Sequence, residues 1–353
     1  NNFADYAEQL PGGNIKPAIY DGDTPNHQRS AMRKSATILM TNPDMLHQGI
    51  LPHHTNWARF FSNLRFVVID EIHIYRGVFG SHFANLMRRL KRICAFYNAY
   101  PQFVLTSATI GNPEELAASL IEQKVHLIDE DGSPKGPAHF LVYNPPLVDE
   151  KLGIRKSSID FGVTFAQKLM HANHQSLVFA RTRRTVEMLL TYLRHRLPIQ
   201  EQNAVRGYRS GYLKYERREI EQGLKSGSVR AVFSTSALEL GVDIGDLDAV
   251  ILVGFPGTIA TARQRIGRAG RKQQPSLGIM IATNEAMDQY LAAHPEYLVD
   301  RNPEQALIDP QNLVILLQHI GCAAFELPFS RSEGFGSMNP EELARFLDLL
   351  EQS

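Results

Sequence analysis

Short apolar runs alternate with helix-like stretches along this chain, and the alternation predicts an α/β fold. In the first part, apolar runs predict strands at Lys16–Tyr20, Thr37–Met40, Phe66–Ile69 and Phe103–Leu105. Between the last two, apolar residues recur every three or four positions, which predicts a helix over Ser81–Tyr97. Four basic residues lie off the apolar face of that helix, and we expect them on a solvated surface: Arg88, Arg89, Lys91 and Arg92.

The stretch from Asp129 to Pro146 is rich in Gly, Pro and Asp and predicts a loop that leads into a linker. The alternation then restarts. The expected strands are Ser176–Ala180, Arg230–Phe233, Ala249–Val253 and Leu277–Ala282. The expected helices are Val163–Ala172, Arg183–Leu197, Lys214–Lys225 and Ala260–Gly267.

This pattern indicates two α/β domains in tandem, each with a mainly parallel sheet. We expect the first domain at residues 1–140, the second at 141–300, and a helical tail at 301–353. Within the tail, Glu341–Glu351 has the spacing of an amphipathic helix. A cleft between two such domains is the usual place for a binding site.

Composition narrows the class of protein. The 353 residues include 43% hydrophobic positions, enough for two cores, and the formal net charge is zero. A nucleic-acid surface must therefore be local. No apolar run approaches the ~18 residues of a membrane span. Because the two cysteines, Cys94 and Cys322, form neither a disulfide framework nor a four-cysteine zinc site, we expect a reduced, cytoplasmic protein.

Two adjacent carboxylates, Asp70 and Glu71, follow the predicted strand Phe66–Ile69, and His73 lies two residues further on. Ligands of open α/β sheets bind at the carboxyl ends of strands. Two acids there suit a magnesium nucleotide, one holding Mg²⁺ through water and the other taking a proton from an attacking water. An ordinary exit from a strand into a loop is the alternative interpretation.

A second polar string, Thr106 to Thr109, follows the strand Phe103–Leu105. Hydroxyl groups at this position can bond an acidic neighbour or His73 across the sheet. Because Ser-Ala-Thr is a common loop tripeptide, only its place one strand–helix unit after the acids makes Ser107 and Thr109 candidates.

The second half carries the strongest local string, from Gln264 to Arg271. Arg268 and Arg271 are three positions apart, which predicts that they share one face of a helix turn. Arginine keeps its charge and offers a planar fork of donors, which suits developing phosphate charge. The alternative is a basic helix end with glycine as its cap.

A third candidate string runs from Ser234 to Ile244 after an apolar strand. Hydroxyl groups and backbone amides at a helix start fit a nucleic-acid phosphate. Gly241 permits a tight turn, and Asp243 would suit a ribose or the arginines.

The ordered strings resemble the motor of a superfamily 2 helicase of the DEAD/DEAH-box type. They are Thr41-Asn42-Pro43-Asp44-Met45-Leu46-His47, Asp70-Glu71-Ile72-His73, Ser107-Ala108-Thr109, Val178-Phe179-Ala180-Arg181, Ser234 to Asp243 and Gln264 to Arg271. The continuation from Ile74 to His82 and the strings Arg206 to Tyr212 and Gly254 to Ile259 are similar to the MrfA-type branch of DNA-repair helicases. The resemblance covers residues 15 to 300.

The resemblance implies two RecA-like domains that hydrolyse ATP in their cleft and pull along a nucleic-acid strand. Asp70 would then hold Mg²⁺ through water, Glu71 would polarise the attacking water, and His73, Ser107 and Thr109 would couple the nucleotide to strand movement. The residues expected at the nucleotide from the second domain are Gln264, Arg268, Arg271, Gly241 and Asp243. Those expected to contact the nucleic acid are Thr41, Asn42, Pro43, Phe179, Arg181, Ser234 and Thr235.

The branch moves 3′ to 5′ on DNA, so a DNA strand or duplex junction is the expected partner and no membrane is. The sequence departs from the family in one respect: no Gly-Lys-Ser or Gly-Lys-Thr of a phosphate loop occurs in it. We therefore expect an internal fragment of a larger helicase, with an incomplete first domain and no ATP hydrolysis of its own. An ATP-independent nucleic-acid-binding remnant and an RNA helicase with the same motor remain as alternatives.

Overall fold

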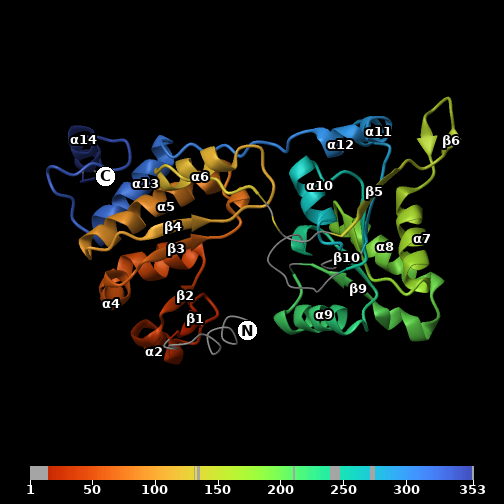
Figure 1. Cartoon of the computed structure of the whole chain (residues 1–353), viewed down its shortest axis with the longest axis horizontal. Coiled ribbons are helices and arrows are strands. Elements are labelled where there is room, and N and C mark those ends of the chain that lie inside the picture. Colours follow the sequence, from red (N-terminus) through yellow and green to blue (C-terminus); the bar gives the residue numbers. More distant parts are fainter. Residues whose placement is uncertain are drawn as a thin grey trace. The chain divides into compact units, whose positions relative to one another are not determined.

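The computed structural model describes residues 15–130, 132, 136–209, 211–238, 247–270 and 275–351. The chain divides into two compact units (Figure 1). Unit 1 combines Asn1–Ile128 with Gln305–Ser353, and unit 2 is Asp129–Glu304. The helices of the expected tail therefore belong to unit 1, so the chain passes from unit 1 to unit 2 and back.

Unit 1 holds short strands and mostly helical connections. In its first segment, the elements are β1 (Pro17–Ile19), α2 (Asn26–Ser35), β2 (Ile38–Met40), α3 (Pro43–Met45), the π-helix η1 (Leu46–Ile50), the 3-10 helix η2 (Leu51–Trp57), α4 (Ala58–Ser62), β3 (Phe66–Ile69), the 3-10 helix η3 (Ile72–Ile74), α5 (Gly77–Phe96), β4 (Gln102–Leu105) and α6 (Pro113–Ile121). Its second segment adds α13 (Leu313–Glu326) and α14 (Pro340–Glu351).

The strands of unit 1 form two parallel pairs, β1 with β2 and β3 with β4. One face of the β3–β4 pair is exposed to solvent, since Phe66 is 59% exposed and Val68 is 65% exposed. The next residue, Ile69, is buried in the core beside Trp57 and Phe61. Among the residues that the structure describes, unit 1 therefore has a packed core on one face of this strand pair.

Helix α5 forms because its apolar residues line one face, and it contacts both α6 and α13. The expectation of a solvated basic face on this helix is wrong. Arg88 and Arg89 are buried, at 5% and 1% exposed. They pair with carboxylates of other segments, Arg88 with Glu122 and Arg89 with Glu326. The packing of α6 and α13 around α5 covers the surface that the helical pattern leaves polar.

Unit 2 contains a complete α/β series. Its elements are β5 (Ala138–Tyr143), β6 (Leu147–Asp149), β7 (Ile154–Arg155), α7 (Ser158–His171), β8 (Ser176–Ala180), α8 (Arg183–Arg196), the 3-10 helix η4 (Ile199–Ala204), β9 (Val205–Tyr208), α9 (Lys214–Ser226), β10 (Ala231–Ser234), the 3-10 helix η5 (Ser236–Leu238), β11 (Ala249–Val253), α10 (Ile259–Ile266), β12 (Ser276–Ile281), α11 (Ala286–Ala293) and α12 (Glu296–Asp300).

Six strands of unit 2 form one parallel sheet in the order β5-β12-β11-β8-β10-β9. Alternate side chains enter two cores, one with α7 and α8 and the other with α9 and α10 (Figure 1). Strands β8 and β11 are buried along their whole length, which explains their unbroken apolar sequence.

The predicted α/β class with mainly parallel sheets is confirmed. The prediction of a loop from Asp129 to Pro146 is wrong in part, because Ala138–Tyr143 forms β5 and pairs with β12 at the sheet edge. Strand β9 was not predicted, since its sequence Val205-Arg206-Gly207-Tyr208 is short and mixed. Within the described residues, no helix combines the length and the apolar character that a membrane crossing needs.

Candidate functional site

The carboxyl ends of β3 and β4 bring Asp70 and Thr106 together. Parallel pairing holds the two exits side by side, because Thr106 N–H donates to Ile69 O and Ile72 N–H donates to Thr106 O, each across 2.9 Å. The Thr106 hydroxyl donates to Asp70 Oδ1, which also accepts the Glu71 backbone N–H at 2.9 Å. Asp70 is therefore an exposed carboxylate whose orientation is fixed by two donors.

Glu71 has a left-handed backbone, with a φ of 56°. This conformation costs a residue other than glycine on the order of 1 kcal/mol or more, and such strain concentrates at functional sites. The turn starts η3 directly after Glu71 and leaves its carboxylate partly exposed. The second acid of the predicted pair is thus held by the fold in a conformation that the sequence alone would not favour.

His73 links the loops that follow β3 and β4. Its Nδ1 accepts the backbone N–H of Ala108 at 3.1 Å, and Glu71 Oε2 lies 3.4 Å from the same atom. Since a backbone N–H can only donate, Nδ1 carries the lone pair and the proton is on Nε2. In this tautomer the approach of Glu71 to His73 is not an ion pair.

The hydroxyls predicted for coupling are arranged differently from expectation. Ser107 Oγ donates to the carbonyl of Ala108 at 2.7 Å, and Thr109 is exposed. The contacts to Asp70 and His73 come from the Thr106 hydroxyl and the Ala108 amide. A hydroxyl of the predicted string does bond an acidic neighbour, but it belongs to Thr106, which was not among the candidate residues. Its position directly after a strand parallel to β3 is the signal that could have selected it.

Thr41, Asn42 and Pro43 follow β2 and form a capped turn. The Thr41 hydroxyl donates to Tyr20 O at 2.7 Å, and Asn42 Oδ1 accepts the backbone N–H of Met45 at 2.8 Å. Pro43 occupies the first position of α3, where a missing N–H costs nothing. Thr41 and Asn42 remain exposed, so this turn keeps its shape through its own bonds while both residues stay at the surface.

Two residues predicted at the nucleic acid are buried in unit 2, which corrects the expectation for their side chains. Phe179 is 1% exposed and Ser234 is 0% exposed. The Ser234 hydroxyl donates to Tyr208 O at 3.0 Å. Phe179 is the residue before the last of β8, Ser234 is the last residue of β10, and the sheet encloses both. Arg181 and Thr235 follow the neighbouring strands β8 and β10 and reach the surface of the same sheet edge.

Arg181 forms an ion pair with Glu285, and both side chains are about half exposed. A carboxylate beside Arg181 holds the guanidinium at the edge of the sheet, close to the exit of β8. An exposed pair of this kind contributes little stability, so the arginine can exchange its partner for a phosphate.

Helix α10 carries Gln264 and Arg265, and Arg265 is buried with its guanidinium 4.8 Å from the centre of the Phe179 ring. The helix ends at Ile266, so the expected helix turn shared by Arg268 and Arg271 is wrong for Arg268. Arg268 lies in the turn that follows the helix, where its N–H donates to Arg265 O at 3.1 Å. Gly270 comes after this turn, with a φ of 118°, and its N–H donates to Leu247 O at 2.9 Å. Three further candidates lie outside the described residues: Gly241, Asp243 and Arg271.

Comparison with known proteins agrees with this geometry. The model of the DEAD/DEAH box helicase family matches residues 1–116, and the model of the helicase conserved C-terminal domain matches residues 162–273. The uncharacterized ATP-dependent helicase YprA of Bacillus subtilis is 49% identical over 95% of this chain and 45% of its own length. The ATP-dependent helicase HRQ1 of Saccharomyces cerevisiae is 42% identical over 88% of this chain and 30% of its own length.

Among solved structures, the DUF1998 helicase MrfA bound to DNA and AMPPNP matches 100% of this chain with a TM-score of 0.93 and 47% identity. The match covers 49% of the MrfA chain. The chain belongs to the MrfA type of superfamily 2 helicases. Both units have the RecA-like fold of these helicases. This helicase chain spans less than half the length of the relatives named here.

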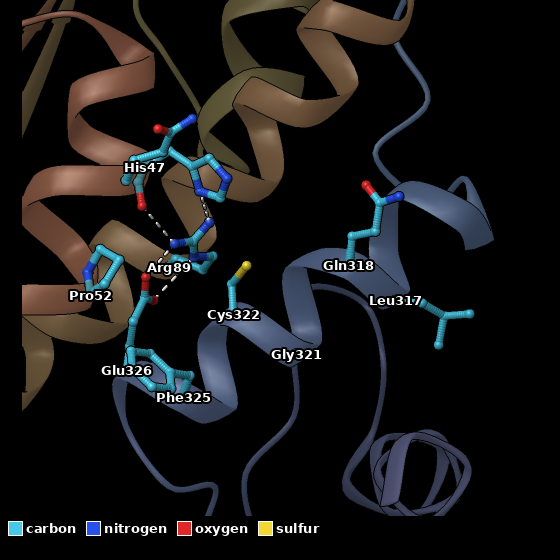
Figure 2. Close-up of a pocket in the computed structure, with 10 residues that line it drawn as sticks. His47, Pro52, Arg89, Leu317, Gln318, Gly321, Cys322, Phe325 and Glu326 are labelled. Atoms are coloured by element: carbon cyan, nitrogen blue, oxygen red, sulfur yellow. Dashed lines mark hydrogen bonds and ion pairs between the residues drawn. The ribbon is translucent and has the colours of Figure 1, made fainter. Parts of the chain in front are cut away.

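A cavity of about 610 Å³ in unit 1 of the helicase chain contains none of the predicted site residues (Figure 2). Arg89 and Glu326 form a fully buried ion pair at its inner wall. Arg89 Nη1 also donates to Nδ1 of His47 at 2.7 Å and of His319 at 3.3 Å. Burial, and then the charge of Arg89, lowers the pKa of His319 to about 3. These charges satisfy one another and hold α13 on α5, so the cavity wall is structural.

Proposed function

We propose that this chain forms part of an ATP-dependent motor that moves 3′ to 5′ along DNA and unwinds it in DNA repair. One observation carries the proposal: the exits of β3 and β4 are joined at Asp70–Thr106 and at His73–Ala108. A nucleotide that binds the acids can act through these contacts on the loop that follows β4. The DNA and AMPPNP of the similar MrfA structure support both ligand classes.

The exposed residues fit a magnesium nucleotide. Mg²⁺ keeps several waters and takes one or two carboxylates together with phosphate oxygens. Asp70 would hold the ion through water, and Glu71 would orient the attacking water and accept its proton. ATP with Mg²⁺ supplies the phosphoryl transfer. From unit 2, the proposed partners of the phosphates are Gln264, Arg268, Arg271, Gly241 and Asp243.

The proposed nucleic-acid contacts divide by exposure. Asn42, Arg181 and Thr235 present side chains to solvent and can donate to phosphate oxygens. The Thr41 hydroxyl, which donates to Tyr20 O, would have to exchange that bond for one to a phosphate. Pro43 shapes the turn after β2 and has no N–H to donate. Phe179 and Ser234 can contribute only backbone groups, because their side chains are buried. Contacts of this kind recognise the sugar-phosphate backbone of a nucleic-acid strand and do not distinguish base sequences.

The first experiment measures binding by this chain itself. Fluorescence anisotropy with labelled single-stranded DNA, and with RNA of the same sequence, is expected to show binding that weakens as salt rises and favours DNA. An equal or stronger preference for RNA would support the RNA-helicase alternative. Absence of binding to both would refute a nucleic-acid role for the chain.

The second experiment measures turnover in a longer protein that supplies a phosphate loop, because this chain contains no Gly-Lys-Ser or Gly-Lys-Thr. Unwinding is expected for a duplex with a 3′ tail and not for one with a 5′ tail. Glu71→Gln should abolish hydrolysis and retain ATP binding, whereas Glu114→Gln, at an exposed position of α6, should leave both unchanged. Hydrolysis by Glu71→Gln at the parent rate would remove Glu71 from the chemical step.

A further inference from the structure

Glu304, the last residue of unit 2, caps helix α10. Its Oε1 accepts the backbone N–H of Ile259 at 2.7 Å, and its Oε2 accepts that of Ala260 at 3.1 Å. Thr258 caps the third amide, from Thr261, at 3.1 Å. The first N–H groups of a helix have no partner within it, and a carboxylate there is stabilised by the helix dipole. Glu304 therefore attaches the last residue of unit 2 to the start of α10.

Arg263 of α10 also binds the segment that leads to Glu304. Its guanidinium donates to the carbonyls of Leu298 at 3.1 Å, Val299 at 2.8 Å and Arg301 at 2.7 Å. These carbonyls lie at and just beyond the end of α12, where a helix leaves acceptors unsatisfied. Residues 298 to 304 are thus held to the helix that carries Gln264, by five hydrogen bonds.

The chain is held again within unit 1, two residues later. The buried side chain of Asn112 pairs with both backbone groups of Ala306: Oδ1 accepts the N–H at 2.8 Å, and Nδ2 donates to the carbonyl at 3.1 Å. The next carbonyl, of Leu307, accepts the N–H of Gly77 at 2.7 Å. Asn112 lies three residues after Thr109, and Gly77 lies four residues after His73.

Asp309 and Pro310, which follow this attachment, form hydrogen bonds with α5. The Ser81 hydroxyl accepts the N–H of Asp309 at 2.9 Å, and Asn85 Nδ2 donates to the carbonyl of Pro310 at 3.0 Å. Gly80 leaves the space that this segment fills, because a Cβ there would lie 2.4 Å from Ile308 Cγ2 and 2.3 Å from the carbonyl oxygen of Tyr75. The attachment to unit 1 is therefore specific and continuous from Ala306 to Pro310.

Gln305 lies between the two attachments, is exposed, and makes no hydrogen bond to α10 or to unit 1 among the described contacts. We propose that Glu304, Gln305 and Ala306 form a strap that couples the loop after β4 to α10, with Glu304 and Asn112 as positioning residues. Because two residues of chain span at most about 7 Å, a displacement of Asn112 is passed to the start of α10. The catalytic meaning of this coupling rests on the proposed function, since α10 carries Gln264 and leads to Arg268.

A four-residue insertion, Gly-Ser-Gly-Ser after Gln305, tests the strap without changing either attachment. Spin labels are placed at Tyr100→Cys in unit 1 and Ile199→Cys in unit 2, where the parent side chains are 82% and 81% exposed. The background carries Cys322→Ser. Cys94 stays in place, because its side chain is buried and burial raises the pKa of its thiol to about 12.

The insertion is expected to broaden the distribution of label distances and to leave the melting temperature unchanged. Affinity for a long single-stranded DNA should fall about tenfold, because two linked half-sites then act at a lower effective concentration. Glu304→Ala and Asn112→Ala should broaden the distances in the same way. Glu296→Ala is the matched control, since Glu296 lies in the same segment, pairs with His294 and is exposed.

A label-distance distribution that is the same in the parent, the insertion variant and Glu304→Ala would overturn the strap. This readout needs neither nucleotide nor DNA. If the parent binds no DNA, the proposed function fails, and the distance measurement still decides whether the strap exists. If DNA binds and the insertion changes neither distances nor affinity, the strap fails and the proposed function stands.

Discussion

The hydroxyl of Thr106 donates a hydrogen bond to the carboxylate of Asp70, 36 positions earlier in the chain. The bond exists because β3 and β4 run parallel, so that their carboxyl ends open at the same edge. It gives the first acid of the Asp-Glu pair a fixed orientation before any ligand arrives. Thr106 is therefore expected to affect ATP turnover indirectly, by holding the carboxylate of Asp70 in position.

Thr106→Val keeps the shape of the side chain and removes the hydroxyl. A hydrogen bond to a charged group contributes about 1.5–3 kcal/mol. If the bond holds Asp70 for the reaction, ATP turnover in a longer protein that supplies a phosphate loop should fall about 10- to 100-fold. Steady-state ATPase assays measure this loss.

Ser107→Ala is the control for that variant, because the Ser107 hydroxyl bonds only the neighbouring carbonyl of Ala108 among the described contacts. Its turnover should stay within about threefold of the parent. Equal losses in Thr106→Val and Ser107→Ala would mean that the whole loop, and not the bond to Asp70, controls the rate.

Glu326→Ala should strongly destabilise unit 1. The change leaves the charge of Arg89 buried without its carboxylate, which typically costs about 3–5 kcal/mol. Denaturant unfolding can be followed by the fluorescence of Trp57, which is the single tryptophan of the chain and is buried in unit 1.

Glu333→Ala provides the comparison, because Glu333 also pairs with an arginine of α5, Arg92, but its side chain is 30% exposed. It should cost about 1 kcal/mol or less. The double variant Arg89→Met with Glu326→Leu should regain most of the stability lost in Glu326→Ala. Similar losses for Glu326→Ala and Glu333→Ala would show that burial does not set the strength of this pair.

The stability of unit 1 should fall on acidification because of His319. Its pKa drops from 6.5 to about 3 in the folded protein, through burial and then the positive charge of Arg89. Between these two values the unfolded chain binds a proton that the folded chain does not. The free energy of unfolding is therefore unaffected by protonation of His319 above pH 6.5. It falls by about 1.4 kcal/mol for each pH unit between pH 6.5 and pH 3.

Unfolding of the parent and of His319→Gln, measured by Trp57 fluorescence between pH 7 and 4.5, tests this sign. The variant should lose part of the pH dependence. His294→Gln, at an exposed position, should keep it. The remaining slope includes His47, whose pKa is also lowered, by burial and by Arg89. An unchanged slope in His319→Gln would contradict the assignment.

Hydrogen exchange should distinguish the two sheets. In β11 every residue is buried, and the strand pairs with β12 on one side and β8 on the other. Strand β3 pairs with β4, and two of its four side chains, Phe66 and Val68, are exposed. Local opening should be easier in β3, so its amides should exchange about tenfold faster or more. Equal protection factors in Phe66–Ile69 and Ala249–Val253 would refute this.

The sequence by itself determined the α/β class and the strands that are buried on both faces. Ser176–Ala180 and Ala249–Val253 were predicted with the bounds that the structure has, and so was Phe66–Ile69, which is exposed on one face. An unbroken apolar run needs a sheet covered by helices, and no long-range information is required to recognise it. The ordered strings also carried the resemblance to superfamily 2 helicases, and local sequence is enough to recognise them.

Only the tertiary structure decided which polar residues remain on the surface. Arg88 and Arg89 have the spacing of a solvated face, and they are buried because α6 and α13 bring carboxylates to them. Strand β5 forms from a Gly- and Pro-rich region because β12 offers an edge with unpaired backbone groups. Asn112 and Ala306 meet across a long separation in the chain, and a pattern of neighbours cannot predict such a pair.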